Sequence, residues 1–333
     1  MLGKLFEKLY LKVFVNIVMY RSHTVVYIEL CNTKGTLQSI EESFQTIKLN
    51  NKVYEFIAEY IKESPYYYIS ILDASSTQGA IHTCNTREME KYFDKDTSKY
   101  KCYNDKWAFY TSKSELALLQ KEYKEIGLDF VFSPFVLLAN FFKDKIDTHL
   151  AMFILIEENY ISLSVFDNSE LLFAKHLDMQ NSHESDELLM DEESDEELDL
   201  DIDSSIDLED VDVMDDLDDF GDIEDLDSIE EIDEFAEDEE MQEDSQTDEE
   251  DVIESGEFNE DYQRFSLIQS AINRFYKDDT YNSKFIEAAY IADGVGISGD
   301  LKRYLEEEMF LSVYVRNVDL CVEVCELAKA ELQ

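Results

Sequence analysis

The sequence carries one pattern of strand and helix signals twice, at an interval of 135 positions. Alternating or continuous apolar residues predict three short strands in each copy, at residues 13–19, 24–31 and 36–44, and again at 150–156, 160–166 and 171–177. The 135-residue shift places apolar residues on apolar residues, as with Ile17 and Met152 or Leu30 and Val165. The identities differ, so the repeat indicates a duplicated structural pattern.

Each group of three predicted strands is followed by helices and strands in one order. The first copy predicts helices at 53–61, 112–127 and from Pro134, with strands at 66–73 and 128–132. The second predicts helices at 265–275 and 301–308, strands at 285–292 and 310–315, and a last helix capped by Asp319. Ser112 and Glu115 match a capping box, and Gly127 is expected to close that helix. Crossover helices imply parallel strand pairs. The expected fold class is therefore α/β (α+β), with a mixed sheet in each of two lobes.

The charge is concentrated in one segment. Of the 77 residues from Glu184 to Glu260, 41 are Asp or Glu and none is Lys or Arg, in a chain of formal net charge −50. Such a segment repels itself and buries too little apolar area to offset the entropy of ordering. We therefore predict a disordered acidic insert at 183–261. It is either a solvating tether or a docking tail for a basic partner.

Composition narrows the functional classes. Nucleic acid as a direct ligand is disfavoured, because binding to phosphates depends on Lys and Arg. No apolar run approaches the ~20 residues of a spanning helix, and the N-terminal stretch does not match a signal peptide. Five scattered cysteines fit reduced thiols in a cytoplasmic protein. Trp107 is expected in a covering loop, with a partner anchor as the alternative.

Isolated motifs give little chemistry. Gly294, Gly296 and Gly299 form a GxGxxG between a predicted strand and helix, but too little chain follows for a dinucleotide-binding domain. Cys321 and Cys325 lie one helical turn apart without nearby ligands, so packing is expected. Ser75, Ser76 and His82 are interpreted as a polar loop, not a triad. No catalytic residue and no metal site is predicted.

The doubled arrangement resembles the two-lobed actin-like (ribonuclease H-like) fold. Two stretches are similar to PilM-like platform proteins of type IV pili and to the cytoplasmic domain of GspL-like proteins of type II secretion. They are residues 126–140, IGLDFVFSPFVLLAN, and residues 160–175, YISLSVFDNSELLFAK. The resemblance implies lobe 1 at 1–146, lobe 2 at 147–182 and 262–333, and the disordered insert between the two parts of lobe 2.

The nucleotide-binding elements of that family are only partly present. The resemblance implies an Asp and a Gly in the first hairpin turn, where residues 18–23 read VMYRSH. The second hairpin turn reads LIEEN at 155–159, with Glu157 and Glu158 but no glycine. The glycine turn DGVG at 293–296 is retained in part, so Gly294, Gly296 and Gly299 are the candidate residues of a residual nucleotide turn. Since phosphoryl transfer depends on positioning and Mg²⁺, we expect no enzyme activity and no cofactor.

The resemblance implies a pseudo-ATPase scaffold of a type II secretion, type IV pilus or DNA-uptake (competence) machine. Its expected partner is an inner-membrane protein, with the assembly ATPase or another basic protein as a candidate for the acidic insert. The chain is expected in the cytoplasm, recruited to the inner membrane by that partner. One alternative is a nucleotide-binding ATPase or kinase that uses Glu157, Glu158 and Asp293 near a metal. A second is an acidic-tail chaperone for a basic protein.

Overall fold

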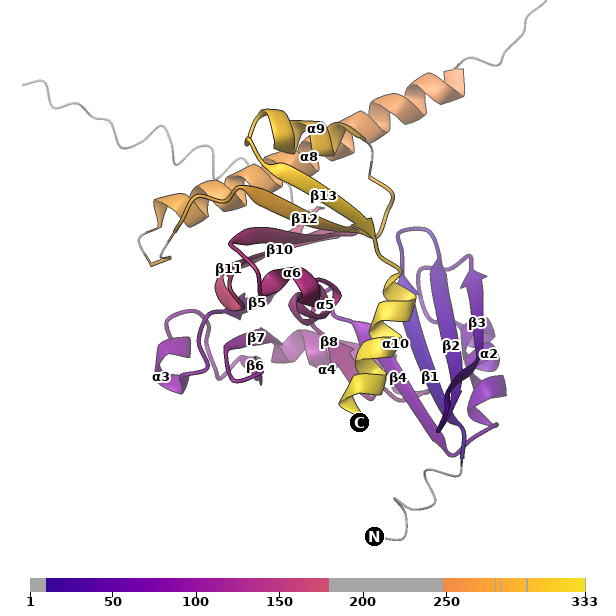
Figure 1. Ribbon diagram of the computed structural model, residues 1–333. Coiled ribbons are helices and arrows are strands. Elements are labelled where there is room, and N and C mark those ends of the chain that lie inside the picture. Colours follow the sequence, from indigo (N-terminus) through magenta and orange to yellow (C-terminus); the bar gives the residue numbers. More distant parts are fainter. Residues whose placement is uncertain (1–9, 180–247, 279, 282, 298, 333) are drawn as a thin grey trace, which may run out of the picture.

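The computed structural model describes residues 10–332 except 180–247, 279, 282 and 298. Within these residues the chain forms two five-stranded sheets and one three-stranded sheet, with helices on both faces of the large sheets (Figure 1). No helix in the described part is long and apolar enough to cross a bilayer.

The first large sheet has the order β3-β2-β1-β4-β8. Its strands are β1 (Lys12–Met19), β2 (Thr24–Asn32), β3 (Gly35–Phe44), β4 (Tyr66–Leu72) and β8 (Phe130–Phe132). The first three strands form an antiparallel meander, and β4 and β8 continue the sheet in parallel with β1. Apolar alternation along β1 places Val13, Val15 and Ile17 on the outer face and Phe14 on the inner one.

The second large sheet repeats this order as β11-β10-β9-β12-β13. Its strands are β9 (Ala151–Ile156), β10 (Tyr160–Asp167), β11 (Glu170–Asp178), β12 (Ala288–Asp293) and β13 (Ser312–Asn317). Strands β12 and β13 begin later than predicted, because Phe285 and Phe310 are 69% and 80% exposed and lie outside the sheet. The same mixed topology in both lobes confirms the predicted two-lobed actin-like fold.

A small sheet in the first lobe was not predicted. It has the order β5-β7-β6, with β5 (Gln78–Ile81), β6 (Ser98–Tyr103) and β7 (Trp107–Ser112), and α3 (Thr86–Met89) between β5 and β6. Trp107 is 2% exposed at the start of β7 and packs near Phe166 of the other lobe, so both predicted roles for it are wrong. Cys84 and Cys102 form a disulfide with Cα atoms 5.8 Å apart, which corrects the expectation of five reduced thiols.

Two helices of the first lobe flank its sheet. Helix α2 (Asn51–Ile61) begins at Asn50, whose side chain accepts hydrogen bonds from Lys52 and Val53, and packs on the outer face. Helix α4 (Lys113–Glu122) is capped by Ser112, but Glu115 bonds to Thr77 instead of completing a capping box. The helix ends at Glu122, earlier than predicted. Gly127, with a φ of +85°, closes the turn that follows, because its backbone N–H donates to the Tyr123 carbonyl at 2.8 Å.

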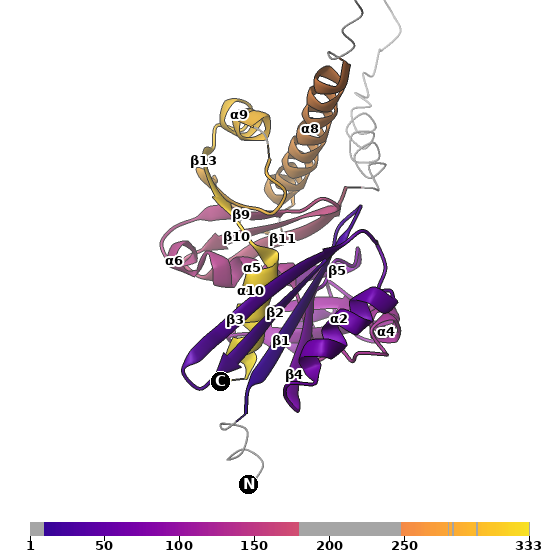
Figure 2. The same ribbon diagram turned by 90° about the vertical axis from the view of Figure 1, so that its right-hand side faces the viewer.

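Each lobe contributes one helix that packs on the sheet of the other lobe (Figures 1 and 2). Helix α5 (Pro134–Phe141), capped by Ser133 with Pro134 at its start, packs on β9 and β10 of the second lobe and precedes the short α6 (Lys143–Ile146). Helix α10 (Leu320–Glu331), capped by Asp319 as predicted, packs on β1, β2 and β4 of the first lobe. The predicted division at residue 146 lies between α6 and β9, but the packing of both lobes crosses it.

Two helices cover the outer face of the second sheet. They are α8 (Asp248–Lys277) and α9 (Gly299–Glu307), which pack against each other and bury residues such as Phe265, Ile268 and Leu301. The predicted disordered insert at 183–261 lies outside the described residues up to 247. Only its last two residues are corrected, because Glu260 and Asp261 belong to α8 and pair with Arg264.

Candidate functional site

Three turns meet between the lobes where the resemblance places a nucleotide. The turn at residues 20–23 joins β1 to β2, and the turn at 157–159 joins β9 to β10. The third turn follows Asp293 at the end of β12. Strands β12 and β9 are parallel and pair Asp293 with Ile156, so their carboxyl ends bring two of these turns together.

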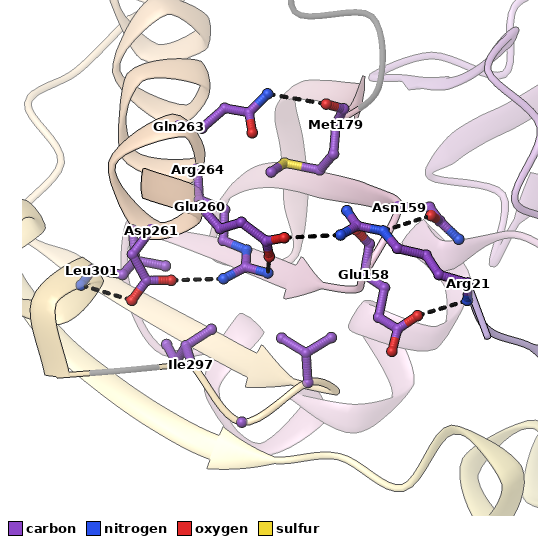
Figure 3. A network of polar contacts seen from close by, with 12 residues as sticks. Arg21, Glu158, Asn159, Met179, Glu260, Asp261, Gln263, Arg264, Ile297 and Leu301 are labelled. Carbon is purple, nitrogen blue, oxygen red and sulfur yellow. Dashed lines mark hydrogen bonds and ion pairs between the residues drawn. The ribbon is translucent and has the colours of Figure 1, made fainter. Parts of the chain in front are cut away.

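Arg21 joins the first two turns directly (Figure 3). Its backbone N–H donates to Glu158 Oε2 at 2.8 Å, and its side-chain Nε donates to Asn159 Oδ1 at 3.1 Å. Its Nη2 also donates to the backbone carbonyl of Glu158. The carboxylate of Glu158 therefore occupies a backbone donor that a phosphate-binding turn would present to its ligand.

The Arg21 contacts continue into α8 and α9 (Figure 3). Arg21 Nη1 donates to Glu260 Oε1 at 2.9 Å, and Glu260 Oε2 also accepts from Arg264 at 2.9 Å. Buried Arg264 pairs with Asp261 at 2.7 Å, and Asp261 accepts from the backbone N–H of Leu301 at 3.3 Å. A continuous polar network thus runs from the first turn of α9 to the hairpin turn of the other lobe.

The glycine turn is satisfied by its own aspartate. Asp293 Oδ1 accepts from the backbone N–H groups of Val295 and Gly296 at 3.1 and 2.8 Å. Ile297 donates to both carboxylate oxygens of Asp293, at 3.2 and 3.0 Å. Gly296 has a φ of +78°, a conformation that favours glycine. Three backbone donors that could face a ligand are therefore paired within the turn.

Gly294 makes room for the side chain of Glu157. A Cβ atom on Gly294 would lie 1.9 Å from Glu157 Oε1 and 3.1 Å from the carbonyl oxygen of Ile156. Gly299 starts α9 and has open space around it. The three candidate glycines thus have different surroundings. Gly294 is explained by the side chain packed against it and Gly296 by its positive φ, and neither explanation requires a nucleotide.

Glu157 is the most perturbed carboxyl group of the site. It is 4% exposed, and no described residue forms a hydrogen bond with its Oε1. Burial, with the nearby charges of Glu158 and Asp293, raises the pKa of Glu157 to about 8. A protonated carboxyl group is thereby favoured near neutral pH.

An interlobe cavity of about 340 Å³ opens beside these turns. Its walls are mostly apolar and come from the ends of β1 and β4, from α4 and from Leu320. Four glutamates line it, and no Lys or Arg is among the described residues that do so. They are Glu115, Glu122, Glu157 and Glu158. The charged carboxylates of this lining repel phosphate groups, which Lys, Arg or Mg²⁺ usually neutralise.

A larger groove, of about 630 Å³, lies beside the small sheet. We call it the small-sheet groove. It is lined by β6 and β7, by α4, by β8 and by Glu331 of α10. Aromatic side chains dominate its surface, and Lys99 and Lys101 lie on its β6 side. They are Tyr100, Tyr103, Phe109, Tyr110, Phe130 and Phe132. Such a surface suits an extended peptide segment with apolar side chains.

The remaining sequence candidates are structural. Cys321 and Cys325 are buried on α10, and burial raises the pKa of both thiols. Ser75 donates to Asp73 at 2.5 Å, whereas His82 packs against the ring of Tyr92. In the described part of the chain, no group of three or more His, Cys, Asp or Glu side chains is placed to hold a metal ion.

Sequence reasoning missed Arg21 and Glu260 as functional positions. Arg21 lies 137 residues from Glu158 and 239 residues from Glu260, so no local pattern links them. The available signal was a basic residue in the hairpin turn where the family pattern has Asp and Gly.

Replacing Arg21 by alanine should loosen the joined turns with a small loss of global stability. Its guanidinium and Glu260 are 39% and 42% exposed, so the free energy of unfolding should fall by about 1 kcal/mol or less. Hydrogen exchange at residues 20–23 and 157–159 should accelerate. Lys101→Ala, which removes an exposed ion pair with Glu331, is the control and should leave these turns unchanged. Unchanged exchange in Arg21→Ala would mean that Arg21 does not hold the turns together.

Comparison with known proteins gives two family models and several solved structures. The model described as a domain of unknown function (DUF8341) matches residues 152–333, and another domain of unknown function (DUF8569) matches residues 10–139. No curated protein matches the sequence.

The similar solved structures share the overall chain path at low identity. One is a protein of unknown function with an actin-like ATPase fold from Bacteroides thetaiotaomicron VPI-5482, at 11% identity and a TM-score of 0.47 over 95% of this chain and 96% of the other. A PilM–PilN type IV pilus biogenesis complex is 10% identical, with a TM-score of 0.49 over 94% of this chain and 89% of the other. The ethanolamine utilization protein EutJ from Carboxydothermus hydrogenoformans is 9% identical, with a TM-score of 0.41 over 96% of this chain and 89% of the other. At this level the likeness concerns the fold alone.

Proposed function

The chain belongs to the DUF8341 family of domains of unknown function, and from that premise we propose that it is a non-catalytic actin-like scaffold. The proposed setting is a type II secretion, type IV pilus or DNA-uptake machine. The sequence resemblance of residues 126–140 and 160–175 to PilM-like and GspL-like proteins supports this choice. The scaffold would bind an inner-membrane protein and be held at the membrane by it.

One observation carries the non-catalytic part of the proposal. In the turns that would hold a triphosphate, backbone donors are bonded to the protein's own carboxylates. Glu158 accepts from the backbone N–H of Arg21, and Asp293 accepts from the backbone of its own turn. The adjoining cavity is lined by four glutamates. Catalysis of phosphoryl transfer requires positive charge and free donors around the phosphates. Here no Lys or Arg is among the described residues that line the cavity, and the backbone donors of Arg21 and of the turn after Asp293 are already paired, which supports the proposal.

The small-sheet groove is the proposed docking site for the partner's tail. Its aromatic lining supplies apolar contact area, and the backbone of β6, an edge strand of the small sheet, offers hydrogen-bonding groups. The acidic segment before α8 would bind a basic protein such as the assembly ATPase, with charge attraction speeding the encounter.

Calorimetry with Mg-ATP tests the loss of nucleotide binding. We expect no binding heat at millimolar Mg-ATP, because no described basic side chain lines the interlobe cavity. Arg21→Ala, which frees the two turns from each other, should remain equally silent. Micromolar binding by the wild-type protein would overturn the non-catalytic proposal and promote the ATPase or kinase alternative.

Capture of the inner-membrane components of these machines tests the scaffold itself. Tyr100→Ala in the small-sheet groove should weaken capture of the partner at least about tenfold, as expected for a central aromatic contact. Tyr314→Ala removes a comparably exposed tyrosine from the edge strand β13 and should have no effect. Failure to capture any inner-membrane component or assembly ATPase would count against the scaffold.

Deletion of residues 183–247 separates the scaffold from the chaperone alternative. This deletion leaves Glu260 and Asp261 in place, so the network to Arg21 and Leu301 is kept. A scaffold should retain its inner-membrane partner after the deletion and lose only a basic partner. Loss of all binding would favour the acidic-tail chaperone.

A further inference from the structure

Strand β13 is an open edge of the second large sheet. It ends the strand order β11-β10-β9-β12-β13, and Figure 2 shows it on the side of that sheet opposite β11. The backbone N–H groups of Ser312 and Val318 donate to carbonyl oxygens at the two ends of β12, at 2.8 and 2.9 Å. Because successive residues of a strand direct these groups to opposite sides, those of Val313, Val315 and Asn317 face away from β12. They are therefore available to another strand.

The other sheet edges in the described part of the chain carry features that hinder strand pairing. The edge strand β3 has two glutamates, β6 has two lysines, and β8 is only three residues long. The edge strands β11 and β5 pack against each other. Strand β13 instead reads SVYVRN, with Tyr314 and Val315 exposed. Its one charged residue, Arg316, is already paired with Asp144, so the composition of β13 favours pairing with an extended segment.

Phe310 lies just before this edge in an unfavourable state. Its backbone φ is +55°, where glycine is the usual residue, and the residue is 80% exposed. A bulky residue in this conformation costs free energy, and exposure of the ring leaves that cost without a gain from packing. Phe285, which precedes β12, is also exposed and lines a cavity of about 150 Å³ with Met309 and Leu311. Apolar contact area is thus available beside the start of β13.

The charges beside the edge indicate the chemistry of its occupant. Glu307 ends α9 and Glu308 follows it, both exposed, at the helix end where negative charge is unfavourable. The last turn of α9 has no basic residue to offset them. A basic segment would do so, whereas a second copy of this chain, with a formal net charge of −50, is repelled. An extended segment with alternating apolar and basic side chains therefore matches the edge, the exposed rings and the charges.

We propose that β13 binds, as an added strand, an extended segment of a protein partner in which apolar side chains alternate with Lys or Arg. The backbone of Val313, Val315 and Asn317 supplies the hydrogen bonds. Phe310 supplies apolar contact, and the two glutamates before it attract the basic side chains. No residue of β13 is among the described residues that line the small-sheet groove, so the proposal is independent of the tail proposed to dock there.

Hydrogen exchange on the full chain with the peptide acetyl-Lys-Val-Lys-Tyr-Lys-Val-amide tests the edge. The acidic segment also attracts this peptide, so exchange is compared at residues 312–317. The peptide should slow exchange of the amides of Val313, Val315 and Asn317 about tenfold or more, because they face solvent in the free protein. The same peptide with every backbone amide N-methylated keeps its charge but has no backbone donors. It should leave exchange at β13 unchanged.

Two substitutions test the contacts. Val315→Pro removes one outward donor and keeps the pairing with β12, so it should weaken peptide binding about fivefold, whereas Val315→Thr keeps the donor and should stay within about twofold. Phe310→Gly should weaken binding about tenfold. It should also raise the unfolding temperature by about 2 °C, because glycine is unstrained at this φ. If Val315→Pro perturbs the sheet, Phe310→Gly still decides the test.

Unchanged exchange at residues 312–317, or equal protection by the peptide and its N-methylated form, would overturn the proposal. Equal peptide affinity of Phe310→Gly and the wild-type protein would overturn it as well. A wild-type dimer that Val315→Pro dissociates would also do so, because a second copy would then fill the edge. None of these outcomes affects the scaffold, which fails separately if no inner-membrane component is captured.

Discussion

Replacing Lys329 by alanine should lower the free energy of unfolding by about 3–5 kcal/mol, the cost of leaving a buried charge without its partner. Lys329 of α10 reaches across to β2 and pairs there with Glu29, and their side chains are 16% and 5% exposed. Thr36 also donates to this carboxylate, at 2.8 Å. Chemical denaturation measures the effect, which should be large because α10 is the helix that the second half of the chain contributes to the first sheet.

The ion pair also predicts a dependence on pH. Burial alone would raise the pKa of Glu29, but hydrogen bonds from Lys329 and Thr36 outweigh it and hold that pKa below the ordinary 4.5. A lowered pKa in the folded state contributes stability above the unfolded pKa, and that stability is lost as pH falls through the folded value. The difference between the wild-type protein and Lys329→Ala should therefore shrink below about pH 4.

Two variants test whether burial of the Lys329–Glu29 ion pair causes the large expected loss of stability. Lys101→Ala breaks the ion pair with Glu331, in which the side chains are 62% and 44% exposed, and should cost at most about 1 kcal/mol. The double variant Glu29→Gln with Lys329→Met should recover much of the loss, because no buried charge remains. Similar losses for Lys329→Ala and Lys101→Ala would contradict the account.

The architecture was predictable because it depends on local patterns that occur twice. Alternating apolar residues located the strands of both meanders, and Ser133 with Pro134 and Asp319 marked the starts of two helices. The sheet that each helix covers was not predictable. Helices α5 and α10 have apolar faces that fit either sheet by pattern, and the exchange between lobes follows from the packing of the whole chain.

The errors occurred where the local pattern is weak or misleading. The strand β6 reads SKYKCY, with two lysines on one side, and β5 has only four residues, so neither has a strong strand signal. Phe285 and Phe310 are strongly apolar but exposed, and they extended two predicted strands too far. The disulfide between Cys84 and Cys102 needs the small sheet to bring the two residues together, so it could not be expected without that sheet.

The candidate site was located by the sequence but its chemistry was not. The turn at residues 20–23, Glu157, Glu158 and Asp293 were singled out, and they do meet between the lobes. What each carboxylate contacts depends on distances that sequence spacing does not contain. Glu158 accepts from Arg21, Asp293 accepts from its own turn, and Glu157 is packed against Gly294.

Replacing Gly294 by alanine should lower the free energy of unfolding by about 2–3 kcal/mol, as expected for overpacking at a tightly filled position. The added Cβ would lie 1.9 Å from Glu157 Oε1 and 3.0 Å from Glu157 Cδ. Either the buried carboxyl group or the turn must move. Urea denaturation measures the loss, with Gly299→Ala as the control that should stay within about 0.5 kcal/mol, because nothing lies within 4 Å of its added Cβ.

The Gly294 and Glu157 substitutions should be strongly non-additive, because one contact accounts for most of the strain. In a Glu157→Ala background, Gly294→Ala should cost at least about 1 kcal/mol less than it does in the wild-type protein. The contact with the Ile156 carbonyl at 3.1 Å remains, so recovery should be partial. A full loss in both backgrounds would mean that this glycine is required by the turn itself. Partial recovery would mean that it is required by the carboxyl group beside it, because only the missing side chain of Gly294 leaves room for Glu157.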